Sequence, residues 1–250
     1  IKFLRYVTLD IAGNVRCKVL PIEGRKPLTE GVDFAMVVLG GLPSHADIMV
    51  ENAGLTAAAG SLQLRPDFAS LRMLPYAPDS AVVLGNLYEQ EEGEPSELCC
   101  RSLLEAMVKH ALTVHNVIFT IGAEIEFVLF DTTDTPVDST NFCDTAILDK
   151  HQSFVSELYA FLKSMDIEIE LLHAESGHGQ FEVVLTYQND PVCLADHVVL
   201  TRQTIAAVAR RHNLKALFLP KYNPNHAGNG LHMHISMKRR AGKQDVLFRA

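Results

Sequence analysis

The chain has 250 residues, with 22 lysines and arginines against 30 aspartates and glutamates, so its net charge is −8 when histidines are neutral. Apolar residues make up 48% and charged residues 21%, which is ordinary for a folded globular protein and excludes a disordered or collagen-like chain. The acidic balance disfavours a broadly basic surface, so neither a nucleic-acid nor a membrane partner is expected.

The cysteines indicate reduced thiols in a cytoplasmic protein. Their number is odd, two are adjacent, and no pair has Cys-x-x-Cys spacing, so neither disulfides nor a zinc site is expected. No apolar run approaches the roughly 18–20 residues that span a bilayer, and a signal-peptide pattern is absent. Both ends of the chain fall within strand-like runs, so we also expect a piece of a longer protein.

The first part of the chain is strand-like and rich in turns. Residues 4–9 and 15–20 carry β-forming side chains on either side of a turn at Gly13, which predicts a hairpin. The stretch 40–60 mixes Gly, Pro, Ser, Asp and Asn without periodicity, which predicts a long loop. Residues 81–87 form an apolar run that predicts a strand.

Composition shifts at an acidic, Pro-containing segment, which predicts a boundary near residue 97 and domains of residues 1–97 and 98–250. Beyond it, apolar residues recur at three- and four-residue spacing in segments separated by strand-like runs. Strands that alternate with helices predict an α/β or α+β domain. The predicted helices cover residues 103–112, 154–165 (with Asp149 as candidate N-cap) and 191–211, and the predicted strands cover 117–130, 167–173, 180–187, 216–219 and 230–237.

Polar side chains gather on three of the predicted strands. In the first, Gly-Ala-Glu-Ile-Glu-Phe at residues 122–127, Glu124 and Glu126 share one face, because side chains alternate along a strand. Two neighbouring carboxylates repel each other. One of them is therefore expected to have a raised pKa unless solvent or a cation screens the charge.

The other two strands add carboxylates and imidazoles. The second, within residues 173–182, carries an amide and a carboxylate on one face, and its flexible glycine turn could return a further carboxylate toward them. The third, after a glycine-rich loop at residues 228–230, carries two imidazoles and a hydroxyl on one face. The side chains concerned are Glu175, Gln180 and Glu182 in the second segment, and His232, His234 and Ser236 in the third.

Each segment alone is more typical of the solvated face of an antiparallel strand. Together they favour a cation site, because four carboxylates and imidazole on rigid strands are ligand chemistry for Mg²⁺ or Mn²⁺. Zinc would favour fewer oxygens and more Cys or His. Two such cations could clamp phosphate oxygens during phosphoryl transfer.

At these residues the sequence resembles the glutamine synthetase family, over nearly the whole chain. GAEIEF, HAESGHGQFE and AGNGLHMHIS look like three motifs of that family in the same order. VTLDIAGNVRCKVLP and LQLRPDFASLRMLPY look like its N-terminal domain, and the stretch from residue 40 resembles a diverged, glutamine-synthetase-like branch. The resemblance implies an α+β fold: a small β-grasp domain, then the first part of a catalytic domain with an antiparallel sheet and flanking helices.

The resemblance also implies a reaction and its ligands. ATP phosphorylates the γ-carboxylate of glutamate, and ammonia or another amine displaces phosphate from γ-glutamyl phosphate, with Mg²⁺ or Mn²⁺ as cofactor. The implied ligands of the metal near glutamate are Glu126, Glu175 and Glu182, and those of the metal that bridges the ATP phosphates are Glu124 and His232. The implied nucleotide contacts are Glu170, His234 and Ser236, and the position whose backbone meets the amino-acid substrate is Gly228.

Three departures from the family pattern leave a second function open. His178 stands where the family commonly has Pro, Ala227 replaces the Asn before the substrate glycine, and no Asp-Gly-Ser-Ser loop is evident between residues 35 and 54. The alternative to a ligase is therefore a catalytically inactive structural or signalling protein on the same fold. A metal-dependent hydrolase of unrelated descent is disfavoured, because three motifs occur in the family's order.

The chain resembles only the N-terminal half of the family's sequence. In the family, the other half supplies a further carboxylate ligand, the arginines that hold phosphate and substrate, and a flap. We therefore expect no glutamine formation by a chain that ends at Ala250, and measurable activity of that chain would contradict the expectation. Family members assemble into double rings, so we expect the intact protein to be a homo-oligomer.

Overall fold

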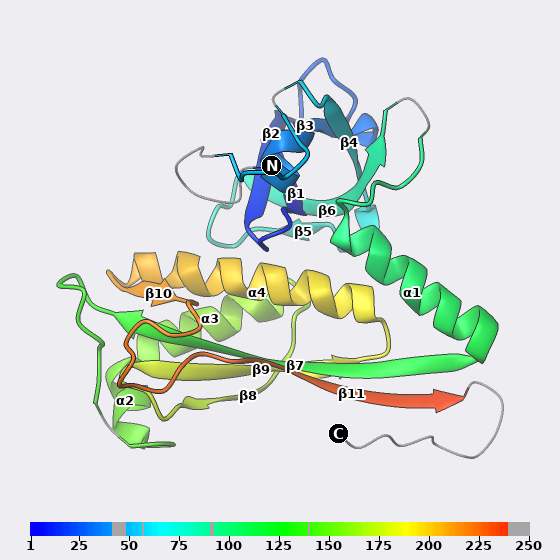
Figure 1. Ribbon diagram of the computed structural model, residues 1–250. Coiled ribbons are helices and arrows are strands. Elements are labelled where there is room, and N and C mark those ends of the chain that lie inside the picture. Colours follow the sequence, from blue (N-terminus) through cyan, green and yellow to red (C-terminus); the bar gives the residue numbers. More distant parts are fainter. Residues whose placement is uncertain (42–48, 57, 91–92, 140, 240–250) are drawn as a thin grey trace. The chain divides into compact units, whose positions relative to one another are not determined.

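The computed structural model describes residues 1–41, 49–56, 58–90, 93–139 and 141–239. The chain forms two compact units, residues 1–114 and 115–250, each with its own β-sheet (Figure 1). The mixed α+β architecture predicted from the sequence is confirmed. The boundary near residue 97 and the β-grasp assignment stay predictions. All five cysteines lie in the described part of the chain and are free there.

The first unit is organised around strand β6 (Ser80–Glu89). Its first half pairs in parallel with β1 (Phe3–Leu9), and its second half pairs antiparallel with β4 (Ser61–Pro66). The strand order is β2-β1-β6-β4-β3, with β5 beside β6, so β6 is central and buried along most of its length. The remaining elements are β2 (Val15–Pro21), β3 (Val32–Ala35) and β5 (Arg72–Met73), the helical turns η1 (Leu28–Glu30), η2 (Val37–Gly41) and η3 (Phe68–Ser70), and helix α1 (Cys100–His115).

Apolar side chains from several strands of this sheet form one core. Tyr6, Leu62 and Val83 are fully buried there, and the Tyr6 hydroxyl donates a hydrogen bond to the carbonyl of Leu28 at 2.7 Å. Strand β6 changes partner at Gly85, where a Cβ would collide with the carbonyl oxygen of Arg65. A glycine is therefore required at the point where the two backbones approach.

The predicted hairpin is present as β1 and β2, and one buried carboxylate organises its turn. Asp10 accepts hydrogen bonds from the backbone N–H of Ala12 at 3.0 Å and of Asn14 at 2.8 Å, and it pairs with Nη2 of Arg16 at 2.7 Å. Burial acts to raise the pKa of Asp10. The hydrogen bonds from Asn14, Arg16 and Ala12 together outweigh burial and lower this pKa below its usual 3.8.

Replacing Asp10 by Ala is expected to lower the free energy of unfolding by about 2 kcal/mol, because it removes the buried carboxylate that accepts the hydrogen bonds of the turn from Ala12, Asn14 and Arg16. Since the folded-state pKa lies below the unfolded value, this contribution is complete above pH 3.8 and is lost as pH falls through the folded-state pKa. Urea denaturation of wild type and variant at pH 7 and pH 2 measures it. The exposed Asp33→Ala in β3 is the control, and a difference that does not shrink at low pH contradicts the prediction.

The second unit is organised around β7 (Val117–Phe130), whose bounds match the predicted strand. One edge of β7 pairs with β9 (Gln180–Gln188), which in turn pairs with β8 (Ile169–Ala174). The other edge pairs with β11 (Leu231–Arg239) along most of its length and with β10 (Lys215–Leu217) at its end. All these pairs are antiparallel. The polar segments lie on neighbouring strands, because β9 and β11 both pair with β7.

Helices α3 (Gln152–Ser164) and α4 (Pro191–Arg211) lie over one face of this sheet (Figure 1). Between helices and sheet, Phe127 of β7 stacks on Phe181 of β9 with ring centroids 5.9 Å apart, and Phe154 of α3 lies 6.4 Å from both. By length and composition α4 could cross a membrane, but 67% of its apolar window is buried. It therefore packs as a core helix.

The helix predicted over residues 154–165 begins earlier, and Asp149 is not its N-cap. Asp149 lies inside a separate short helix, α2 (Thr145–Lys150), whose N-cap is Asp144. Helix α3 follows after His151, which makes no side-chain capping bond. By contrast, α4 has the predicted bounds, and the Asp190 carboxylate caps it by accepting two backbone N–H bonds.

Candidate functional site

The polar side chains lie on the face of the second sheet opposite α3 and α4. Phe127 points toward the helices, so its neighbour Glu126 projects from the other face, as alternation predicts. Residues directly opposite each other on paired strands bring the side chains into two rows. One row is His173, Glu182 and Glu126 across β8, β9 and β7, and the other is Glu124 and His232 across β7 and β11.

The first cluster consists of Glu124, Glu182 and His232, whose potential ligand atoms all lie within 4.8 Å of one another. The two carboxylate oxygens of Glu124 lie 3.0 Å from Nδ1 of His232 and 2.6 Å from Nε2 of His234. Burial acts to raise the pKa of Glu124, but the hydrogen bonds from His234 and His232 outweigh it, so this pKa is lowered. Glu124 therefore keeps its negative charge.

The second cluster consists of His173, Glu175 and Glu182, again with potential ligand atoms within 4.8 Å. The predicted turn brings Glu175 back toward Glu182, and the N–H of Glu175 donates to the carbonyl of Gln180 at 2.8 Å to close it. Glu182 is common to both clusters. Burial first, and then repulsion from Glu124, raise the pKa of Glu182. A negative charge at Glu182 is therefore unfavourable until something positive balances it.

Glu126 is buried beside the two clusters and is a member of neither. Its Oε2 accepts a hydrogen bond from Nε2 of Gln180 at 2.7 Å, and its Oε1 lies 3.6 Å from Nδ1 of His232. Nε2 of Gln180 also lies 2.9 Å from the carbonyl oxygen of Gly228. Gln180 thus links Glu126 to the backbone of the loop in which the amino-acid contact is expected.

A cavity of about 360 Å³ opens onto both clusters. Two of the three expected nucleotide contacts, Glu170 and His234, line it. The third, Ser236, instead donates from Oγ to the carbonyl of Thr120 at 3.2 Å. The other lining residues are Gly122, Ala123, Glu124, Leu171, His173, Glu182, Val184 and Tyr187.

One residue of the site, His173, was not among the candidates from sequence. It lies two positions before Glu175, near the end of β8 and directly opposite Glu182 on β9, and its closeness in sequence to Glu175 is the signal that could have found it. His178, which replaces the family's proline, takes part in neither cluster: its ring lies 4.3 Å from that of His226. The turn accommodates this histidine while Glu175 still reaches Glu182.

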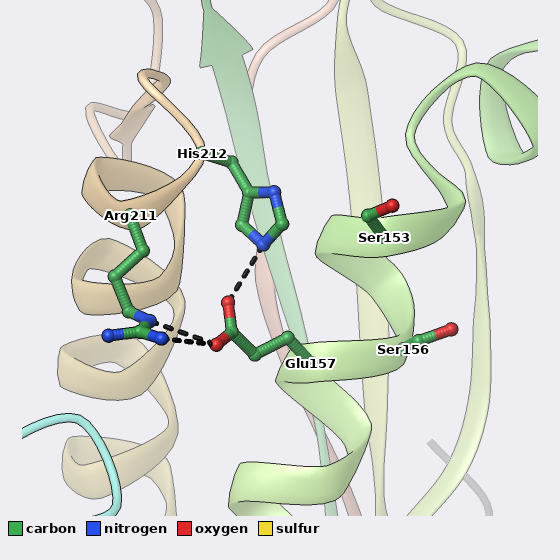
Figure 2. Close-up of a pocket in the computed structure, with 5 residues that line it drawn as sticks. All are labelled: Ser153, Ser156, Glu157, Arg211 and His212. Carbon is green, nitrogen blue, oxygen red and sulfur yellow. Dashed lines mark hydrogen bonds and ion pairs between the residues drawn. The ribbon is translucent and has the colours of Figure 1, made fainter.

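A second cavity, of about 720 Å³, lies between α3 and α4 and includes none of the expected site residues (Figure 2). Its charged side chains already pair with one another. Glu157 accepts from Nε of Arg211 at 2.9 Å, and its other oxygen lies 2.8 Å from Nε2 of His212. The hydrogen bond from Arg211 is the main cause that lowers the pKa of Glu157. This group ties two helices together.

The donor set of the two clusters fits divalent cations. The described residues that line the cavity include three carboxylates and no Lys or Arg, so the negative charge there has no fixed cation to balance it. Each cluster offers carboxylate oxygens and one imidazole, which is a ligand set that suits Mg²⁺ and Mn²⁺. Structural zinc sites typically have more sulfur or nitrogen ligands.

Comparison with known proteins gives consistent matches. The family model described as "Glutamine synthetase, catalytic domain" matches residues 97–249. Gamma-glutamylpolyamine synthetase GlnA3 of Streptomyces coelicolor is 33% identical over 242 residues, which are 94% of this chain and 51% of that protein. The glutamine synthetase of Methanocaldococcus jannaschii is 28% identical over 254 residues, 95% of this chain and 53% of that protein.

Solved structures agree with these matches. A structure described as "Apo GmaS without ligand" superposes with a TM-score of 0.84 at 25% identity and covers 97% of this chain and 56% of that one. A second, described as a novel glutamine synthase homolog, superposes with a TM-score of 0.84 at 27% identity and covers 96% and 56%. The chain therefore spans about half the length of the relatives it matches.

Proposed function

This chain belongs to the glutamine synthetase family, and on that premise we propose that the protein is an ATP-dependent carboxylate–amine ligase that acts on glutamate. The observation that carries the proposal is the pair of acid–imidazole clusters that share Glu182 at one cavity. A phosphoryl transfer needs its negative charge balanced by cations, and the three carboxylates that line this cavity are suited to hold them.

The proposed residue roles use residues of both clusters together with Glu126, which is buried beside them. Glu126, Glu175 and Glu182 hold a cation near glutamate, and Glu124 and His232 hold one near the ATP phosphates. Bound Mg²⁺ or Mn²⁺ would stabilise the charge that develops on the transferred phosphoryl group. Glu126 is buried beside the two clusters, and its hydrogen bond with Gln180 fixes its carboxylate next to the strand that carries Glu182.

Substrate positioning is assigned to four further residues. Glu170 and His234 line the cavity, which supports nucleotide contacts for both. Ser236, two residues after His234 on β11, is proposed as the third nucleotide contact. The Gly228 backbone is proposed to meet glutamate. A Cβ at Gly228 would collide with the carbonyl oxygen of Pro220, so the loop requires its glycine.

The amine is proposed to be ammonia or an alkylamine, including polyamines. Relatives of this chain are named glutamine synthetase, gamma-glutamylpolyamine synthetase and glutamate–methylamine ligase, so the family tolerates several amines. The substitution of Ala227 at the substrate loop is consistent with a site that differs from that of a glutamine producer.

The proposal is tested by ATP-dependent phosphate release from the intact protein with glutamate, Mg²⁺ or Mn²⁺, and a panel of ammonia, methylamine, isopropylamine and spermidine. We expect release with at least one amine, its loss in Glu126→Ala, and no change in the exposed Glu97→Ala. If no amine supports phosphate release, the ligase proposal is wrong. Failure combined with nucleotide binding that Glu126→Ala leaves intact would favour the non-catalytic alternative.

A substitution at Gly230 tests the proposed cation sites without removing any of the proposed ligands. A Cβ there would lie 2.6 Å from Nε2 of His232 and 2.8 Å from Oε1 of Glu126, and both are the ends of side chains. Gly230→Ala is therefore expected to displace these groups and weaken Mn²⁺ binding about 10–100-fold, measured by calorimetry. The melting temperature should change little. Gly228→Ala, which meets backbone instead, should lower the melting temperature, and equal effects of the two variants would contradict this reading.

Assembly into a homo-oligomer, expected as a double ring, is also proposed for the intact protein, on the strength of family membership. Light scattering at micromolar concentration tests it, and a monomer would contradict it.

A further inference from the structure

The imidazole of His173 is held in one orientation. It is 16% exposed, its ring packs edge-on against Phe142 with centroids 5.6 Å apart, and its Nδ1 lies 3.0 Å from the carbonyl oxygen of Ala174. A carbonyl oxygen only accepts hydrogen bonds, so Nδ1 carries the proton of this contact. The lone pair of the neutral ring is then on Nε2, which points into the second cluster.

This lone pair faces a carboxylate. Nε2 of His173 lies 3.2 Å from Oε1 of Glu182, and the potential ligand atoms of His173, Glu175 and Glu182 are all within 4.8 Å. Two acceptor atoms this close repel each other unless a positive centre lies between them. Two ligands bonded at about 2.1–2.2 Å and at right angles are about 3 Å apart, so the observed spacing suits one coordination sphere.

The hydrogen bond at the opposite nitrogen has the form seen in metal-binding histidines. Such residues donate their second ring N–H to a carboxylate or backbone carbonyl, which fixes the tautomer and orients the ring. His173 does this with Ala174. Glu126, by contrast, is turned toward Gln180 and lies outside this cluster.

We propose that His173 is a direct ligand, through Nε2, of the divalent cation held by Glu175 and Glu182, which makes this a mixed imidazole–carboxylate site. The inference rests on the proposed function for the presence of a cation there. It adds a nitrogen ligand and hence a selectivity: imidazole strengthens binding of Mn²⁺ and Zn²⁺ more than binding of Mg²⁺.

The proposal is tested on the intact protein by metal binding and spectroscopy. Calorimetric titration of His173→Ala is expected to give a dissociation constant for Mn²⁺ at this site about 10–100-fold higher than in wild type, with a smaller change for Mg²⁺. His173→Asn, which keeps a polar side chain of smaller size, should behave the same way. His110→Ala, in α1 of the first unit, is the matched control and should bind Mn²⁺ as wild type does.

Electron spin-echo modulation from imidazole nitrogen identifies the ligand directly. The other cluster contains His232, so His232→Ala provides the background in which only one cluster retains an imidazole. Nitrogen modulation of bound Mn²⁺ should persist in His232→Ala and disappear in the double variant with His173→Ala. Persistence in the double variant, or Mn²⁺ affinity unchanged by His173→Ala, overturns the assignment.

The failures of the two proposals are distinguishable. A wild-type protein that binds no Mn²⁺ overturns both the proposed cation sites and the role of His173. A wild-type protein that binds Mn²⁺ and releases phosphate, while His173→Ala keeps its affinity and its spectrum, overturns only the role of His173. Melting temperatures measured without cation show whether a loss of binding in His173→Ala is a loss of fold. In His173→Asn with a wild-type melting temperature, weaker Mn²⁺ binding supports the assignment and unchanged Mn²⁺ binding overturns it.

Discussion

Replacing Glu182 by Gln is expected to lower the rate of amine-dependent phosphate release by the intact protein at least about 10³-fold, equivalent to about 4 kcal/mol of transition-state stabilisation. Glu182 is the carboxylate common to both clusters, so an amide there weakens both proposed cation sites at once. Divalent cations such as Mg²⁺ depend on carboxylate charge for their affinity. The measurement is the release rate at saturating ATP, glutamate and Mn²⁺.

The same variant separates loss of function from loss of fold. Burial and repulsion from Glu124 raise the pKa of Glu182, so its charge is unfavourable in the cation-free protein at neutral pH. Glu182→Gln should therefore melt at the wild-type temperature or above it without cation, and should lack the stabilisation that Mn²⁺ gives the wild type. Glu168→Gln, an exposed position just before β8, is the control. Full activity, or a large fall in the cation-free melting temperature, would contradict the shared role.

Replacing Phe127 by Ala is expected to lower the free energy of unfolding of the second unit by about 3–5 kcal/mol. Phe127 is fully buried, stacks on Phe181 with 16° between the ring planes, and lies 5.8 Å from Phe218. Truncation loses the buried area and leaves a cavity that rigid neighbouring rings cannot fill. Urea denaturation followed by circular dichroism measures the change.

The control for Phe127 is Leu219→Ala, whose side chain is 55% exposed and which should cost less than about 1 kcal/mol. A loss below about 1.5 kcal/mol for Phe127→Ala would show that the aromatic cluster does not hold the helices to the sheet. Phe127 and Glu126 are adjacent on β7, so the two effects test opposite faces of one strand. The face with the helices supplies stability, and the face without them supplies charge.

Helix ends and strand faces were predictable where the signal is local. The bounds of α4 follow from Asp190 before Pro191 and from an apolar pattern that continues to the end of the helix. The shared face of Glu124 and Glu126 follows from alternation along β7. The break before α3 was missed, because Asp144 and Asp149 are equally good cap residues and only the packed structure distinguishes them.

Contacts between distant segments were not predictable in the same way. The parallel pairing of β1 with β6 joins segments more than 70 residues apart, and no local pattern specifies it. The rotamers of the site are a second case. The carboxylate of Glu126 is hydrogen-bonded to Gln180, and His173 lies in the second cluster, because hydrogen bonds and packing choose among side-chain orientations that alternation leaves equal.

The amino-acid sequence by itself determined the chemical inventory of this protein: carboxylates and imidazoles on three strands, each on one face, in an order that resembles one family. Periodicity is a property of neighbours along the chain, so it needs no knowledge of the rest of the molecule. Only the tertiary structure decided that Glu182 belongs to two clusters and that His173 faces Glu175. Those relations depend on lateral register between strands, which the burial of the opposite, apolar face of the sheet selects.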